Sequence, residues 1–232
     1  MGLPAACLFD LDGLLLDTEP LHSQAWLEAT AGFGLTLAPD QLLALRGRRR
    51  LDCAEQVRSW IVQADLAPPS PEALLAARQP ISERLMRQVP AIPGAQRLVK
   101  RCLAQAIPAA LVSSSSAAAV AHKSAPHGWI SLLKTRVLGD DPDLAAGKPA
   151  PDPYVLAAQR LGVDPSSCWA FEDSLAGARS AHAAGCVVHV LLPADQHLAI
   201  GLQADLPDGC TLLQSLDAVK LSKAAGNGSQ VG

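Results

Sequence analysis

The chain has 232 residues, 49% of them hydrophobic and 18% charged, which is typical of a compact globular protein with one large domain or two unequal ones. Its formal net charge of −3 excludes a general electrostatic attraction to nucleic acid or to an anionic membrane surface. The sequence has no run of about 18 consecutive hydrophobic residues and no basic segment before its first hydrophobic run, so we expect neither a membrane span nor secretion.

The first predicted element is a buried strand that ends in two carboxylates. Hydrophobic residues run from Ala5 to Phe9, and Asp10, Asp12 and Gly13 follow them. Alternate residues of a strand point the same way, so the two carboxylates can converge where the strand ends, and the glycine allows a sharp turn. Open α/β sheets bind their ligands at this edge. Carboxylates this close repel each other unless a divalent cation lies between them or one is protonated. The alternative is an ordinary surface turn.

The pattern is then helical from residue 16 to residue 90, with no strand between. The expected helices cover residues 18–31, 39–46, 51–64 and 72–89. Pro80 is expected to kink or split the last of them. On the first helix Thr18, His22 and Trp26 are spaced four residues apart and therefore share one face, just downstream of the carboxylates.

Strands and helices alternate after residue 90, which indicates a mostly parallel sheet with helices on both faces. The expected strands are 109–112, 137–138, 168–171 and 187–192. We therefore predict an α/β protein: a Rossmann-like core made of residues 1–15 and 91–222, with an inserted α-helical domain at 16–90. Residues 223–232 are small and polar, and we predict a disordered tail.

Two polar clusters beyond the second strand are candidates for binding an anion. Hydroxyls and backbone N–H groups of Ser113, Ser114 and the two serines after them can form an anion cradle at a strand-to-helix turn, although a plain loop is the alternative. Lys148 lies between Gly147 and Pro149 ahead of a helix, so its position is restricted, as a cation that holds a phosphoryl group requires. Its alternative is a solvated lysine in a linker.

A further pair of acids, Glu172 and Asp173, follows the strand 168–171. They can be helix caps, or they can complete the oxygen shell of Mg²⁺, which prefers carboxylate ligands and is often shared with a substrate phosphate.

These clusters, in this order, resemble the four motifs of the haloacid dehalogenase superfamily. The matching residues are D-L-D-G at 10–13, the serine at 113, G-K-P-x-P-D at 147–152 and F-E-D-S-x-x-G at 171–177. The helical insertion resembles the subclass with an α-helical cap, which contains β-phosphoglucomutase and many sugar-phosphate phosphatases. Dehalogenases of the superfamily lack the second aspartate, so the activity that named the family is not expected here.

The resemblance implies roles for the acidic residues. Asp10 is expected to attack phosphorus and form an aspartyl-phosphate, and Asp12 to act as general acid and then as general base. Mg²⁺ is expected to bind Asp10, the backbone carbonyl of Asp12 and Asp173, with Glu172 binding it directly or supporting its ligands.

The resemblance also implies substrate contacts. Ser113, Ser114 and Lys148 are expected to bind the transferring phosphoryl group. His22 on the cap resembles a histidine that interacts with the acid/base aspartate, although it can equally be a packing residue. Arg50 ends the basic run 46–50 and matches an arginine that binds a second phosphate, although that run can also be a solvated loop.

We expect a Mg²⁺-dependent phosphatase of small phosphorylated sugars or polyols, with a β-phosphoglucomutase-type mutase as the alternative. A mutase must hold a second phosphate strongly, but Ser116 and Ala117 stand where the mutase has a lysine and an asparagine, and its later cap lysine corresponds to Gln79, with Arg78 beside it. A catalytically inactive binding protein of the same fold is a further alternative, and the competent residues at all core positions weigh against it.

Cysteine usage favours a cytoplasmic location. The six cysteines are scattered through hydrophobic segments without a C-x-x-C pair, as buried reduced thiols would be. We expect a monomer whose partner is a small phosphorylated metabolite, with no nucleic-acid or membrane partner.

Overall fold

The computed structural model describes residues 2–45 and 50–221. The described residues form two compact units. The sheet unit contains the chain up to Leu15, the segment Ile92–Ala117 and the chain from Trp129 on, and the helical unit contains Leu16–Ala91 and Ala118–Gly128. The predicted tail at 223–232 lies outside the described residues, as do the arginines at 46, 48 and 49.

The sheet unit is built on a parallel sheet that has six strands within the described residues, in the order β3-β2-β1-β4-β5-β6. The strands are β1 (Ala6–Phe9), β2 (Ala109–Val112), β3 (Thr135–Val137), β4 (Cys168–Glu172), β5 (Val187–Leu191) and β6 (Thr211–Leu213). This arrangement confirms the predicted α/β class with a mostly parallel, Rossmann-like core. The sequence pattern did not predict β6, which has three residues.

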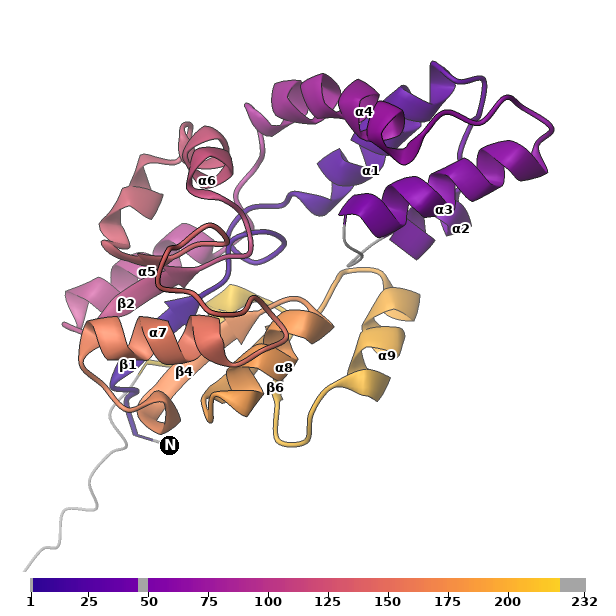
Figure 1. The fold of residues 1–232 in the computed structure, drawn as a ribbon. Coiled ribbons are helices and arrows are strands. Elements are labelled where there is room, and N and C mark those ends of the chain that lie inside the picture. Colours follow the sequence, from indigo (N-terminus) through magenta and orange to yellow (C-terminus); the bar gives the residue numbers. More distant parts are fainter. Residues whose placement is uncertain (1, 46–49, 222–232) are drawn as a thin grey trace, which may run out of the picture. The chain divides into compact units, whose positions relative to one another are not determined.

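Helices cover both faces of the sheet, so β1, β2 and β4 are buried on both sides. Helices α7 (Asp152–Leu161) and α8 (Leu175–Ala183) pack on the face that carries Leu8 and Ala170; both lie across the strands in Figure 1. Cys7 points to the opposite face, where its thiol meets Cys102 of α5 (Ala95–Ala104). Helix α9 (Gln196–Asp205) was not predicted.

The strand order places the ends of β1 and β4 side by side at the point where the winding direction reverses. From β1 the chain adds β2 and β3 on one side and then returns to add β4, β5 and β6 on the other. Phe9, Phe171 and His189 lie in register on β1, β4 and β5, with ring centroids 4.9 and 5.0 Å apart. The residues after Phe9 and Phe171 therefore leave the sheet at the same level, at the place where open α/β sheets bind ligands.

The helical unit consists of α1 (Glu19–Ala31), α2 (Pro39–Leu45), α3 (Arg50–Gln63) and α4 (Pro71–Met86), together with residues 118–128, which include most of α6 (Ala117–Ser124). Its hydrophobic cluster comes from the first three helices, the chain between them and Leu74. The alternation of strands and helices in the sequence assigned residues 118–128 to the core, whereas the structure groups them with the helical unit. In the structure, His122 Nε2 lies 2.7 Å from the carbonyl oxygen of Glu83, and His127 Nε2 lies 2.7 Å from that of Val89.

The structure shows two local features of the helical unit, at Pro80 and at Thr18. Pro80 does not split its helix, because α4 continues from Pro71 to Met86. Thr18 is the N-cap of α1, but its hydroxyl makes no capping hydrogen bond: its backbone is already helical, with φ −85° and ψ −21°, whereas a capping side chain needs an extended backbone.

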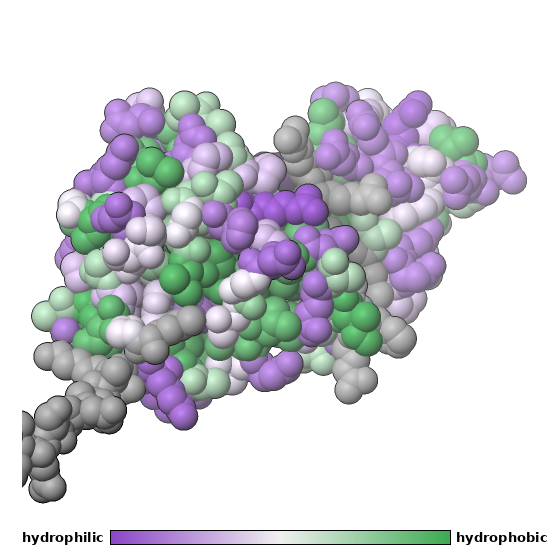
Figure 2. Space-filling view, turned by 90° about the horizontal axis from the view of Figure 1, so that it is seen from below, coloured by the Kyte–Doolittle hydropathy of each residue, from purple (hydrophilic) through white to green (hydrophobic). Residues whose placement is uncertain are grey.

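The exposed large hydrophobic residues are scattered over several elements: Leu51, Val62, Leu103, Leu132, Ile200 and Leu212. On the face seen in Figure 2, hydrophilic residues lie among the hydrophobic ones. None of the helices in residues 2–45 and 50–221 is long and hydrophobic enough to cross a membrane.

Candidate active site

Lys148 is the centre of the polar cluster at the ends of β1, β2 and β4. Its ammonium group donates to Asp10 Oδ1 at 2.6 Å, to Glu172 Oε1 at 2.5 Å and to the carbonyl oxygen of Val112 at 3.0 Å. These acceptors match the three N–H groups of a lysine. The side chain is 5% exposed, so the alternative of a solvated linker lysine is wrong.

Glu172 is held by donors on both of its carboxylate oxygens. Oε1 accepts from Lys148 and, at 2.5 Å, from the hydroxyl of Tyr154 on α7. Oε2 accepts from the backbone N–H of Asp173 and from the hydroxyl of Ser174, both at 3.3 Å. Ser174 is also the N-cap of α8, accepting from the N–H of Gly177 at 3.1 Å. The capping role suggested for the two acids therefore belongs to the serine.

Asp10, Glu172 and Asp173 form a group that can hold a metal ion, because one carboxylate oxygen from each lies within 4.8 Å of the others. Two glycines allow this approach. A Cβ atom on Gly13 would lie 1.9 Å from Asp173 Oδ2, and one on Gly177 would lie 1.9 Å from the carboxylate carbon of Glu172. Gly13 also has φ of +82°, which side chains rarely allow.

Burial and neighbouring charges shift the pKa values of Asp10 and Lys148. Burial raises the pKa of Asp10 to about 7; Lys148 acts against this shift, and the carboxylates of Glu172 and Asp12 add to it. Burial would lower the pKa of Lys148, but Asp10 and Glu172 raise it above its ordinary value. The lysine is therefore charged and only partly offsets the surrounding negative charge.

The serine loop after β2 lies at the same edge of the sheet. Ser113 is buried, and its hydroxyl accepts from the N–H of Ser115 at 3.1 Å. Ser114 is exposed, so of the two predicted phosphate ligands only Ser113 is buried next to the strand end that Lys148 contacts. The hydroxyl of Ser115 donates to Asp12 Oδ2 at 2.9 Å.

The cap residues predicted to contact substrate lie in the helical unit. Arg78 on α4 is 6% exposed; it donates to Nδ1 of His22 at 2.9 Å and stacks over Trp26 at 4.9 Å. Because a guanidinium can only donate, His22 Nδ1 must accept, and in the neutral ring the proton is on Nε2. Arg50 donates to Gln79 Oε1 at 2.7 Å. The roles of His22 and Arg50 towards a substrate stay predictions.

Sequence reasoning missed Tyr154, the contact of Ser115 with Asp12 and the packing of Arg78. Tyr154 is the one tyrosine of the chain and follows Lys148 by six residues, which was a usable signal. The contacts of Ser115 and Arg78 depend on folding and had no comparable signal.

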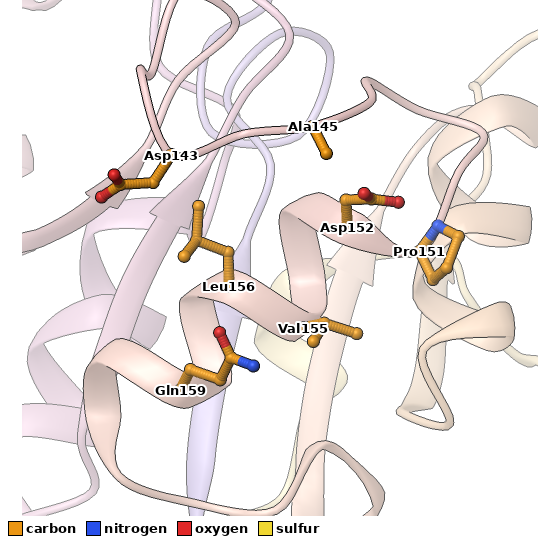
Figure 3. Close-up of a pocket in the computed structure, with 7 residues that line it drawn as sticks. All are labelled: Asp143, Ala145, Pro151, Asp152, Val155, Leu156 and Gln159. Atoms are coloured by element: carbon orange, nitrogen blue, oxygen red, sulfur yellow. The ribbon is translucent and has the colours of Figure 1, made fainter.

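A surface pocket of about 340 Å³ lies elsewhere on the sheet unit (Figure 3). Asp143 and Ala145 line it from the loop before α7, and Asp152, Val155 and Gln159 line it from the helix or its start. Asp143 is paired with Arg160 at 2.8 Å. None of the buried polar atoms without a partner in the described residues belongs to the pocket, and we assign it no function.

The sheet is doubly wound, and carboxylates and a buried lysine lie together at its switch point. This arrangement is typical of an enzyme whose ligand site is lined by acidic residues. The chain belongs to the haloacid dehalogenase-like hydrolase family, whose profile matches residues 4–185. This confirms the family predicted from the four motifs.

Named relatives cover most of the chain. A probable pseudouridine-5'-phosphatase of Drosophila melanogaster is 37% identical over 194 residues, which are 81% of this chain and 80% of that protein. Hexitol phosphatase A of Escherichia coli (strain K12) is 35% identical over 190 residues, 81% of this chain and 83% of that protein. A solved HAD family hydrolase from Deinococcus radiodurans R1, with bound phosphate and sodium, has a TM-score of 0.73 and 29% identity, covering 92% of this chain and 93% of that one.

Proposed function

We propose that the protein is a Mg²⁺-dependent phosphatase of small phosphorylated sugars or polyols that works through an aspartyl-phosphate on Asp10. One observation carries the proposal: a buried lysine bridges Asp10 and Glu172 within a cluster of carboxylates at the switch point of the sheet. The phosphatase names of two relatives that match about four fifths of the chain support the reaction class.

The residues present fit a magnesium ion. Among the described residues of this cluster, the carboxylates of Asp10, Asp12, Glu172 and Asp173 outnumber the single lysine, so a divalent cation would relieve their repulsion. Asp10, Asp173 and the backbone carbonyl of Asp12 would hold it. When bound, the ion would neutralise charge on the phosphoryl group and let an anionic nucleophile approach it.

Glu172 supports the site in another way. Both of its oxygens already accept hydrogen bonds, from Lys148 and Tyr154 on one side and from Asp173 and Ser174 on the other. Its proposed role is to position Lys148 against Asp10, and its carboxylate lies close enough to the other two acids to support the metal ion as well. The three N–H groups of Lys148 already donate to protein acceptors. To bind a phosphoryl oxygen as well, one of these N–H groups would have to donate to two acceptors at once.

The reaction would proceed in two balanced steps. A carboxylate oxygen of Asp10 bonds to phosphorus as the ester P–O bond breaks, and Asp12 gives its proton to the departing alcohol oxygen. Water then attacks the phosphorus of the aspartyl-phosphate and gives a proton to Asp12, while the bond between phosphorus and the Asp10 oxygen breaks. Phosphate leaves, and both aspartates return to their starting states.

The test is Asp10→Asn, which keeps the shape of the side chain and removes the nucleophilic carboxylate. We expect it to abolish release of phosphate from p-nitrophenyl phosphate in the presence of Mg²⁺, and removal of the ion with EDTA to abolish the activity of the unchanged protein. An Asp10→Asn variant that retains the full rate would refute the assignment.

The substrate class is tested with a panel of phosphorylated sugars, polyols and nucleosides, measuring free phosphate. β-Glucose 1-phosphate with a trace of the 1,6-bisphosphate is included, because glucose 6-phosphate as the product in place of free phosphate would favour the mutase. We expect free phosphate.

A further inference from the structure

Ser115 contacts the residue proposed to transfer protons. Its hydroxyl donates to Asp12 Oδ2 at 2.9 Å, and its side chain is only partly buried. A serine hydroxyl at this distance is a normal hydrogen-bond donor to a carboxylate. The bond therefore links the serine hydroxyl directly to the carboxyl group that is proposed to carry the proton.

The backbone of Ser115 is held firmly by neighbouring strand ends. Its N–H donates to Ser113 Oγ at 3.1 Å, and its carbonyl oxygen accepts from the N–H of Gly139 at 2.9 Å. Ser113 is itself tied to β3, because its N–H donates to the carbonyl oxygen of Val137 at 3.0 Å. Hydrogen bonds to the loop backbone therefore fix the position from which the serine hydroxyl contacts Asp12.

Gly139 shows how closely this loop is packed against the chain after β3. A Cβ atom on Gly139 would lie 2.2 Å from the carbonyl oxygen of Ser114, too close for any side chain. The next residue, Asp140, accepts from the N–H of Ala117 at 2.8 Å and so fastens the other end of the loop.

We infer that Ser115 is a positioning residue that orients the carboxyl group of Asp12 for proton transfer to the leaving alcohol. The inference rests on the proposed phosphatase function and deepens it. Asp12 lies beyond the end of β1 and directly before the turn that begins at Gly13. Proton transfer requires the acid within hydrogen-bond reach of the leaving oxygen, and the bond from Ser115 selects one orientation.

The test compares two substrates that differ in their need for an acid. Nitrophenolate leaves without protonation, whereas the alcohol of a polyol phosphate needs a proton. For Ser115→Ala we expect kcat/KM to fall about tenfold for the best polyol phosphate of the panel and to stay within about twofold for p-nitrophenyl phosphate. The ratio kcat/KM is used because it reports only steps up to formation of the aspartyl-phosphate.

Three further variants complete the test. Ser115→Thr keeps the hydroxyl and should restore the polyol rate. In an Asp12→Asn background, Ser115→Ala should cause no further loss, since the residue it positions no longer carries a proton. Ser59→Ala, at an exposed serine of α3, is the matched control and should leave both rates unchanged.

Each other outcome overturns the inference in a recognisable way. Equal losses on both substrates, or an additional loss in the Asp12→Asn background, would mean that Ser115 only maintains the loop. A faster Ser115→Ala enzyme would mean that the bond holds Asp12 out of place. An unchanged protein with no activity on any phosphate ester would overturn the proposed function itself.

Discussion

Gly177 gives a direct test of whether Glu172 must stay where it is. The residue lies in the first turn of α8, and its φ is outside the left-handed region, so alanine causes no backbone strain. The obstacle is the side chain of Glu172: a Cβ atom would lie 1.9 Å from its carboxylate carbon and 2.0 Å from each oxygen. Ordinary contacts begin at 3.4 Å, so the carboxylate has to move by about 1.5 Å.

Two opposing terms set the effect on stability. Alanine is favoured over glycine in a helix by about 1 kcal/mol. Moving Glu172 away from Lys148 breaks a buried ion pair, which costs about 3–5 kcal/mol. We therefore expect Gly177→Ala to lower the free energy of unfolding by about 2–4 kcal/mol. Because Lys148 loses the partner that holds it against Asp10, a displacement of this size should also lower kcat about a hundredfold.

The assay combines urea unfolding with release of phosphate from p-nitrophenyl phosphate. The matched control is Gly201→Ala in α9, where nothing lies within 4 Å of the added Cβ, and it should be neutral or slightly stabilising. If Gly177→Ala were as stable and as active as this control, the placement of Glu172 would have no bearing on the site.

Other predictions concern hydrogen bonds and a buried histidine. Tyr154→Phe removes the donor to Glu172 and should lower the free energy of unfolding in urea by about 1–3 kcal/mol; an unchanged value would argue against that bond. Burial lowers the pKa of His189 to about 4, so the unfolded chain, with a pKa near 6.5, takes up the proton first and stability falls as pH drops from about 6.5 to 4. Between pH 7.5 and 4.5 the free energy of unfolding in urea should fall by up to about 3 kcal/mol less in His189→Phe than in the unchanged protein. An equal fall in both proteins would contradict this. Arg78→Met removes the donor to His22 Nδ1, so the ¹⁵N shifts of the ring should change from a single Nε2–H tautomer to a mixture, whereas identical shifts would show that the arginine does not select it.

Much of the site was predictable because parallel strands end at one edge of a sheet. Asp10, Ser113 and Glu172 each follow a hydrophobic strand segment, so recognising the segments was enough to bring the residues together. The misses have physical reasons too: β6 has three residues, too few for a periodic pattern, and Pro80 was judged by local propensity although α4 continues through it.

The sequence by itself determined the class of fold, the family and the polar groups at the strand ends, since these depend on local hydrophobic pattern and motif spacing. Only the tertiary structure decided that Tyr154 and Lys148 share one oxygen of Glu172, that Ser115 contacts Asp12, and that Gly177 must lack a side chain. These contacts join side chains far apart in the chain or on different elements, and their distances depend on how helices and loops pack against the sheet.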